Sequence, residues 1–197
     1  MTLAPLTLTG RYVRLEPLAD VHFPALVRHG NEPDIWRWTP YVRRDPVAAV
    51  TAWRERLERA FSGGHALIFA TISLATGEAI GGTSMQDISA ENRSLEVGGT
   101  WLARSVWRTA VNTECKYLLL RHAFEVFGCN RVQLKTDLNN TRSQSAIERL
   151  GAKREGVLRS HLVMPDGRIR DSVMFSIIAG EWPGVRQRLE TFLARPA

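Results

Sequence analysis

The order of elements between residues 93 and 178 constrains the fold of this chain more than any other feature. An apolar strand, SLEVGGTWLA, runs into a tight basic loop, RSVWRTAVN, and this loop opens a helix, TECKYLLLRHAFEVFG. A second strand, RVQLKTDL, follows, and then a short helix that begins near Asn140 and ends at Leu150-Gly151. Two further apolar runs flank a Pro165-Asp166-Gly167 turn. Strands and helices in this succession predict an α+β fold in layers.

The loop between the first strand and its helix predicts an anion site. A helix begins with free backbone N–H groups and the positive end of its dipole, and both favour a phosphate. Arg104 and Arg108 lie in the loop and would add charge-assisted contacts. A plain strand–helix turn with solvated arginines explains the same residues, so the loop alone leaves both interpretations open.

The rest of the chain predicts one α+β domain over residues 1–197 with a mixed, mostly antiparallel sheet. Alternating or apolar runs indicate strands at 11–18, 66–74 and 78–88, the last two joined by an Ala75-Thr76-Gly77 hairpin turn. Helical spacing and start signals indicate helices at 20–29, with Asp20 as cap, at 45–63 and at 180–194. Residues 31–46 are rich in proline and aromatics and predict a loop or a broken helix.

Charge and composition bear on the class of partner. The net charge of +6 and the sequence pI of about 10.0 would suit nucleic acid, but the basic residues are scattered and no RNP1, helix-turn-helix or zinc-finger pattern accompanies them. A polyanionic cofactor explains a local basic patch equally well. No apolar run can span a bilayer, and the first residues lack a secretion signal. We therefore expect a cytoplasmic protein with no membrane and no nucleic-acid partner.

The cysteines and histidines predict neither a disulfide framework nor a metal site. Cys115 shares a helix face with Leu118, Leu119 and Ala123, which favours a buried thiol, and Cys129 gives no framework with it. The five histidines show no metal-ligand spacing.

The element order resembles the acyl-CoA-binding half of the GNAT superfamily of N-acetyltransferases. The stretches LEVGGTWLA, WRTAVNTE and LKTDLNNTRSQSAIERLGAKREGVLR are most similar to its RimJ/RimL-type branch, whose members acetylate protein N-termini and related amines. The resemblance implies acetyl-CoA as cofactor and direct transfer, in a ternary complex, to a primary amine such as a protein N-terminal α-amine. Three alternatives stay open: a small-molecule amine acetyltransferase, an acyl-CoA sensor on the same fold, and, from the pI alone, a nucleic-acid-binding module.

The resemblance also implies which residues hold the cofactor. The family loop usually reads Gln/Arg-x-x-Gly-x-Gly/Ala, and here Trp107, Ala110 and Asn112 stand at its three defined positions. Backbone N–H groups near Leu102 would polarise the thioester carbonyl, because the strand that bears them would splay from the next one. The implied cofactor residues are Leu102, Ala103, Arg104, Trp107, Arg108, Thr109, Ala110, Val111, Asn112, Thr113, Asn140 and Ser143.

Two polar residues, Glu96 and Ser143, are candidates for catalysis, and Asn140 is a candidate for cofactor contact. Asn140-x-x-Ser143 resembles the second motif of the branch, in which the Asn contacts the pantetheine arm and the Ser hydroxyl would protonate the departing thiolate; helix capping by Asn140 is compatible with that role. Glu96 is the candidate base, since acetyl transfer requires a neutral amine and an α-amino group has a pKa of ~7.7–8.0. The alternative for Glu96 is a surface carboxylate opposite Arg93.

The acceptor pocket is expected near the N-terminal aromatic loop. Trp36, Trp38 and Tyr41 lie where GNAT enzymes often build this pocket, although such aromatics also serve as packing anchors. Glu96 and Asp87 complete the candidate substrate residues, Asp87 by attracting a cationic acceptor. An exposed Trp182 beside the closing helix would suit a homodimer contact.

Overall fold

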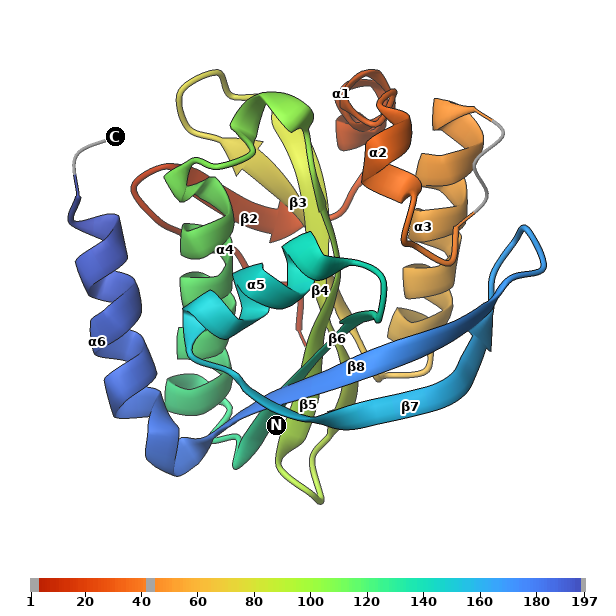
Figure 1. Ribbon diagram of the computed structural model, residues 1–197. Coiled ribbons are helices and arrows are strands. Elements are labelled where there is room, and N and C mark those ends of the chain that lie inside the picture. The colour runs from red at the N-terminus through yellow and green to blue at the C-terminus, as the bar shows by residue number, and fades with distance from the viewer. Residues whose placement is uncertain (1–3, 42–44, 196–197) are drawn as a thin grey trace.

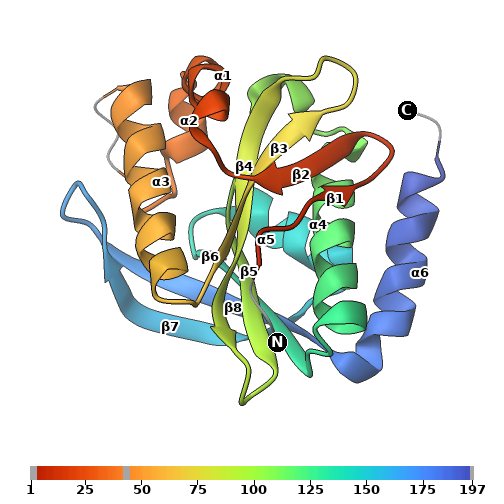
Figure 2. The ribbon, with the colours of Figure 1, turned by 180° about the vertical axis from the view of Figure 1, so that it is seen from behind.

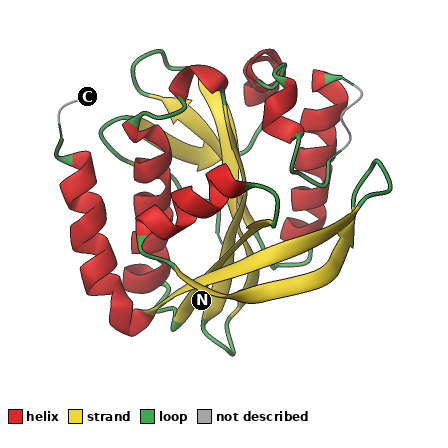
Figure 3. Ribbon diagram, in the orientation of Figure 1, coloured by secondary structure: helices red, strands yellow, loops and turns green. Residues whose placement is uncertain are grey.

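Eight strands form one mixed sheet in this computed structural model, which describes residues 4–41 and 45–195 (Figures 1 and 3). The sheet order is β1-β2-β3-β4-β5-β6-β8-β7, and every neighbouring pair is antiparallel except β5 and β6. The predicted α+β fold with a mostly antiparallel sheet is confirmed. The strands are β1 (Leu8–Thr9), β2 (Val13–Pro17), β3 (Leu67–Ser73), β4 (Ala79–Ser89), β5 (Ser94–Leu102), β6 (Arg131–Asp137), β7 (Lys153–Val163) and β8 (Ile169–Ile178).

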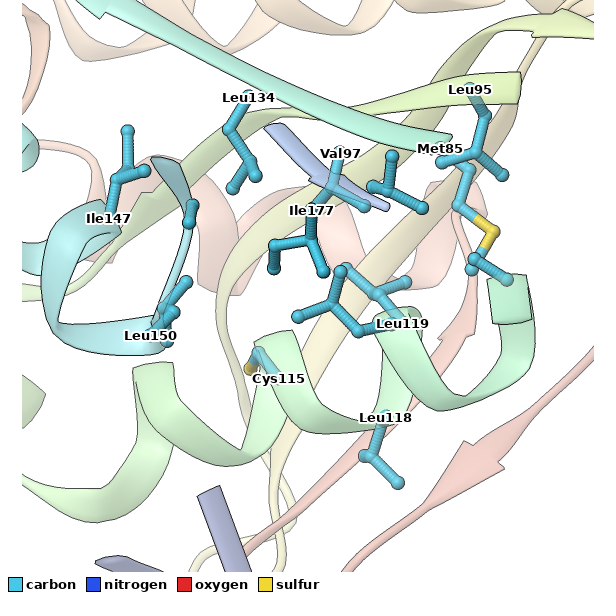
Figure 4. Packing of buried hydrophobic residues seen from close by; sticks show 14 of the residues in the cluster. Met85, Leu95, Val97, Cys115, Leu118, Leu119, Leu134, Ile147, Leu150 and Ile177 are labelled. Carbon is cyan, nitrogen blue, oxygen red and sulfur yellow. The ribbon is translucent and has the colours of Figure 1, made fainter. Parts of the chain in front are cut away.

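Helices cover both faces of the sheet (Figure 2). Two hydrophobic clusters show this division: α4, α5 and α6 pack on one side of the strands, and α1, α2 and α3 on the other. Part of the first cluster is shown in Figure 4, where Val97 and Ile177 of the sheet lie above Leu119 of α4 in this view. The helices are α1 (Phe23–His29), α2 (Pro33–Trp36), α3 (Pro46–Ser62), α4 (Ala110–Arg121), α5 (Thr141–Leu150) and α6 (Trp182–Leu193).

Helix α4 begins three residues before the predicted start at residue 113, because Thr109 caps it. The Thr109 side chain accepts a hydrogen bond from the backbone of Val111, which satisfies one of the free donors of the first turn. Within the helix, the buried Glu114 carboxylate accepts three backbone N–H bonds of 2.7 to 2.8 Å from residues 11–13. This carboxylate therefore fixes α4 against the turn that joins β1 and β2.

Strands β5 and β6 pair only at their beginnings. Their parallel ladder joins residues 94–96 to residues 131–133, although β5 continues to Leu102 and β6 to Asp137. On its other side β5 carries a bulge opposite β4, where the register shifts between Gly82 and Ser84, and Gly99 adopts a left-handed backbone with φ of 59°. A bulge bends its strand. The predicted splay of β5 from β6 is therefore present, and it begins just after Glu96.

Several local predictions differ from the structure. Trp182 is buried rather than exposed: its ring stacks on Phe124 at 5.3 Å and its indole N–H donates to Glu125 at 3.0 Å, so the expected contact through an exposed Trp182 is wrong. Asp20 is not a helix cap but the first residue of a 3₁₀ turn, and its carboxylate binds Arg54 at 2.5 Å.

Other segments agree with the sequence more closely. Residues 31–46 contain the four-residue helix α2, as a broken helix would, while residues 42–44 lie outside the described residues. Strand β1 is too short for an alternation signal and was not predicted. None of the helices in the described ranges has the length and apolar character needed to cross a membrane.

Candidate active site

One cavity of about 1010 Å³ opens where β5 leaves β6. Its wall is formed by β5 and β6, the loop before α4, the first turns of α4 and α5, and the segment after α2. It spans β5 from Glu96 to Leu102, which is roughly 20 Å at the usual rise of a strand. We call the part near the α4 loop the Arg108 end, and the part lined by Tyr41, Arg56, Glu96 and Arg170 the Tyr41 end.

The Arg108 end carries a concentration of positive charge. Arg104, Arg108, Arg142 and Arg149 all line it. The Arg142 guanidinium lies over the Trp107 ring, 3.8 Å from its centroid, and this stacking holds the cation in place. Arg104 approaches Glu32 at 3.5 Å across an exposed surface, a pair that contributes little. The N-terminus of α4 adds its dipole to this field.

The loop itself has an unusual backbone at Arg108. Arg108 has a φ of 64°, a left-handed conformation that favours glycine and is strained for a long side chain. Ala110, which stands at the central glycine of the family loop, is the first helical residue, and the left-handed backbone lies two residues earlier, at Arg108.

The backbone of Leu102 faces the gap between the two strands. The N–H of the next residue, Ala103, donates to Ile80 of β4, and successive groups of a strand point to opposite sides. The Leu102 N–H therefore points away from β4, into the space that β6 leaves. The Leu102 carbonyl, on the same side, accepts a bond of 2.9 Å from the Trp107 indole, which leaves the N–H as the available group.

Glu96 lies inside the cavity wall rather than on a surface. It is 1% exposed, and its Oε2 accepts from the Lys135 ammonium at 2.8 Å and from Gln133 at 3.4 Å. Its Oε1 accepts from Gln86 at 2.6 Å. The partner is Lys135 and not Arg93, so the alternative of a surface carboxylate opposite Arg93 does not describe its surroundings.

Asn140 and Ser143 reach the same cavity from the start of α5. Asn140 caps the helix: its Oδ1 accepts the Ser143 N–H at 3.1 Å, which leaves the Asn140 side-chain amide N–H groups for a ligand. The Ser143 hydroxyl makes no hydrogen bond to any residue that the structure describes. Capping and a role in the cavity are therefore compatible, as the sequence suggested.

The remaining predicted residues divide into two groups. Leu102, Arg104, Trp107, Arg108, Thr109 and Asn112 line the cavity with Asn140 and Ser143, and so do Trp38 and Tyr41. The others do not: Ala103, Val111 and Thr113 are buried in the core, Ala110 opens α4, Asp87 is exposed with Lys135 at 3.9 Å, and Trp36 packs on Trp101 and Tyr41.

Lys116 is a cavity residue that sequence reasoning missed. It is buried, its ammonium donates to the Thr100 hydroxyl of β5 at 2.5 Å, and no carboxylate within the described part of the chain forms an ion pair with it. Burial lowers the pKa of Lys116 to about 8, although Cys115 and Glu96 act in the opposite direction. One signal was present in the sequence: Lys116 lies four residues after Asn112, on the same helix face. The chain has only three lysines, and the structure places two of them, Lys116 and Lys135, in the wall of this cavity.

Comparison with known proteins agrees with this geometry. The model of the acetyltransferase (GNAT) domain family matches residues 13–153. The chain is 30% identical to the uncharacterized N-acetyltransferase p20 of Bacillus licheniformis over 180 residues, which covers 90% of this chain and 96% of that protein.

Solved structures show the same fold over nearly the whole chain. A GCN5-related N-acetyltransferase from Brucella melitensis is 30% identical, with a TM-score of 0.87 over 98% of this chain and 87% of that one. RimJ of Mycobacterium smegmatis, in complex with CoA-disulfide, is 25% identical, with a TM-score of 0.81 over 95% of both chains. The chain therefore belongs to the GNAT family of acetyltransferases, and it is an acyl-CoA-dependent N-acetyltransferase.

Proposed function

We propose that the protein transfers the acetyl group of acetyl-CoA directly to a primary amine, most specifically the α-amine of a peptide or protein N-terminus. The observation that carries the proposal is the single cavity that joins an arginine-rich helix start to a buried carboxylate along the free edge of β5. One end suits a polyanionic donor and the other suits an amine, with about 20 Å of strand edge between them.

The residues of the Arg108 end fit coenzyme A. Its phosphates require positive charge and backbone donors, and the four arginines with the start of α4 supply both. The pantetheine arm carries amide groups that can pair with an open strand edge, and β5 has such an edge after Glu96. Asn140 adds a side-chain amide beside it. Bound acetyl-CoA supplies the activated thioester from which the acetyl group is transferred.

Two groups of the chain stabilise negative charge near the middle of the cavity. The Leu102 N–H points into the gap and acts as an oxyanion donor, whose removal typically costs about 10²–10³ in rate. The Lys116 ammonium donates a hydrogen bond to the hydroxyl of Thr100, which lies two residues before Leu102 on β5. Because Lys116 has no carboxylate partner among the described residues, its charge is available to oxygen or sulfur atoms that become negative during transfer.

Proton movement is assigned to Glu96 and Ser143. Glu96 takes the proton of the acceptor amine, directly or through water, at the Tyr41 end. Oε1 accepts one hydrogen bond and Oε2 accepts two, so Oε1 keeps a lone pair that can take this proton while Gln86, Gln133 and Lys135 stay in place. Ser143, whose hydroxyl has no partner in the described residues, gives a proton to the departing thiolate and regains one from water, to which Glu96 releases the proton of the amine.

Direct transfer is supported by the state of the two cysteines. Cys115 and Cys129 are both buried and neither lines the cavity. Burial raises the pKa of Cys115 to about 12 and that of Cys129 to about 11. A thiol is a poor nucleophile compared with its thiolate, so neither residue suits an acetyl-enzyme intermediate.

The test uses purified protein, acetyl-CoA and a peptide that carries both a free α-amine and an internal lysine. We expect tandem mass spectrometry to locate the acetyl group on the α-amine, and acetyl-CoA to raise the melting temperature. Acetylation of the lysine alone, or of small polyamines but no peptide, would redirect the proposal to another amine. Binding of acetyl-CoA without turnover on any amine would favour a sensor.

A further inference from the structure

We propose that the acceptor carries a carboxylate close to its amine, and that Arg170 and Arg56 bind this carboxylate at the Tyr41 end of the cavity. This inference rests on the proposed function, because it specifies which amines the same site accepts. It uses side chains that no motif of the sequence indicated.

The cations near the Tyr41 end are unequally paired among the described residues. Lys135 pairs with Glu96 at 2.8 Å, and Arg168 pairs with Asp137 at 2.6 Å. Arg170 approaches only Asp137, at 3.9 Å, and that carboxylate is already engaged by Arg168. Lys135 also lies 3.9 Å from Asp87, so three carboxylates face three close cations here, and Arg170 is the cation whose only carboxylate contact is long and shared.

Arg170 is held in a fixed orientation with one nitrogen unused. It is 5% exposed; its Nε donates to the Ser172 hydroxyl at 3.0 Å and its Nη1 to the Trp38 carbonyl at 3.3 Å. Its Nη2 makes no hydrogen bond to the described residues. Burial lowers the pKa of Arg170, in the direction expected for a desolvated cation. A buried charge of this kind is costly unless it is paired, and a ligand carboxylate would supply the pair.

Arg56 faces the same end of the cavity from helix α3. It lines the cavity, is exposed at its mouth, and forms no ion pair or side-chain hydrogen bond with the described residues. Arg56, Arg170 and Glu96 all act electrostatically on the Tyr41 hydroxyl, which shows that the four groups share one neighbourhood.

A carboxylate is the ligand that this arrangement fits. The planar guanidinium of Arg170 offers donors that match a carboxylate, and Arg56 adds a second positive charge. Glu96 and Asp137 lie close to Arg170 and would oppose a doubly charged phosphate more than a singly charged carboxylate. The acceptor's amine would face Glu96 while its carboxylate faces the arginines. Such a carboxylate can come from an acidic side chain near a peptide N-terminus or from the α-carboxylate of a free amino acid.

Matched acceptors test the proposal and separate the two sources. Peptides that begin Ser-Glu and Ser-Gln differ only in the side-chain carboxylate, and serine and serinamide differ only in the α-carboxylate. We expect kcat/KM for the carboxylate member of one pair to exceed that for its amide by about 10- to 100-fold, the scale of a charge-assisted hydrogen bond. A preference in the peptide pair identifies an acidic N-terminus, and a preference in the other pair identifies a free amino acid.

Variants connect the preference to the two arginines. Arg56→Gln should reduce the carboxylate-to-amide ratio toward 1, and Arg170→Gln should reduce it further. Arg59→Gln is the control, because Arg59 is exposed on the same helix but does not line the cavity, so the ratio should stay at its original value. Since Arg170 also holds the Trp38 carbonyl, Arg56→Gln keeps the test valid if Arg170→Gln fails to fold.

The possible results separate a failure of the carboxylate site from a failure of the proposed function. Equal acetylation of the α-amine in both members of each pair would overturn the carboxylate site while leaving the proposed function intact. A preference that survives both Arg56→Gln and Arg170→Gln would also overturn it. Binding of acetyl-CoA with no turnover on any of these acceptors would overturn the proposed function together with the inference.

Discussion

Replacing Lys116 with methionine should stabilise the protein while it slows acetyl transfer. Burial lowers the pKa of Lys116 from 10.5 to about 8, which means that the folded state holds the ammonium at a cost. Each pKa unit corresponds to 1.36 kcal/mol, so this cost is about 3 kcal/mol at pH 7. Lys116→Met removes it and loses one hydrogen bond to Thr100, worth about 1 kcal/mol, while Thr100 keeps its 2.7 Å bond to Thr83.

The expected gain is therefore about 2 kcal/mol. For a chain of 197 residues this corresponds to a rise in Tm of roughly 4–8 °C. The gain in the free energy of unfolding should decrease as the pH rises. Because the folded pKa is the lower one, the cost is fully present below pH 8 and disappears as pH rises toward the unfolded value of 10.5. Cys115 and Glu96, the other groups that act on Lys116, have smaller effects than burial.

Urea unfolding of the wild type and of Lys116→Met, at pH 7 and near pH 10, measures the difference in their free energies of unfolding at each pH. Lys135→Met is the matched control: it removes the partner of the buried Glu96 and should destabilise the protein by several kcal/mol. Acetyl transfer by Lys116→Met should fall by about 10²-fold at pH 7, the scale of one lost electrostatic donor. If Lys116→Met melts at or below the wild-type temperature, with a difference that is the same at both pH values, the assignment of an uncompensated buried charge is refuted.

Three further predictions concern the proposed chemistry. Glu96→Gln should lower the rate near neutrality by about 10²–10⁴ and recover partly at high pH, where the amine is already neutral; an unmoved pH–rate profile would favour a water relay with no essential side chain. Arg108→Ala should weaken acetyl-CoA binding by about 1–3 kcal/mol, as measured by calorimetry. Arg108→Gly should weaken binding equally but raise the free energy of unfolding by about 1 kcal/mol, because glycine adopts the φ of 64° at this position without strain. A Cys115→Ala, Cys129→Ser double variant should keep most of its activity, with initial rates of a ternary complex; an acetyl-cysteine that turns over at the catalytic rate would contradict direct transfer.

Local signals explain why the sequence predicted the order of elements but not all of the site. The residues next to the loop at residue 108 are enough to predict the strand and the helix that flank it, and local sequence also predicts the Asn140 cap of α5. The left-handed backbone of Arg108 has no such signal, since glycine normally occupies such a position.

The charge pattern of the cavity depends on contacts between segments that are far apart in the chain. Arg170 reaches the carbonyl of Trp38, which is 132 residues away, and Glu96 finds Lys135 on the neighbouring strand. From the sequence, Glu96 was the candidate base or a surface carboxylate opposite Arg93; its partner Lys135 could not be identified, because the register of β5 against β6 decides it. The sequence shows that lysine is rare in this chain. Which lysines face the cavity, however, depends on that register and on which face of α4 is turned toward β5.

Helix α3 connects the opening of the cavity to the acceptor end. The Trp53 indole donates to the Gly99 carbonyl at 2.7 Å, and a side chain at Gly99 would meet Ser84 and Leu57 at 3.0 to 3.2 Å. The helix therefore fixes the bulge that bends β5 away from β6, and a β-carbon at Gly99 would press on that contact. Arg56 follows Trp53 by three residues, on a neighbouring part of the same helix surface. Helix α3 thus holds open the edge of β5 that we assign to the acyl donor, and it also positions Arg56, which we assign to the acceptor. Binding of the donor and binding of the acceptor therefore depend on the same helix.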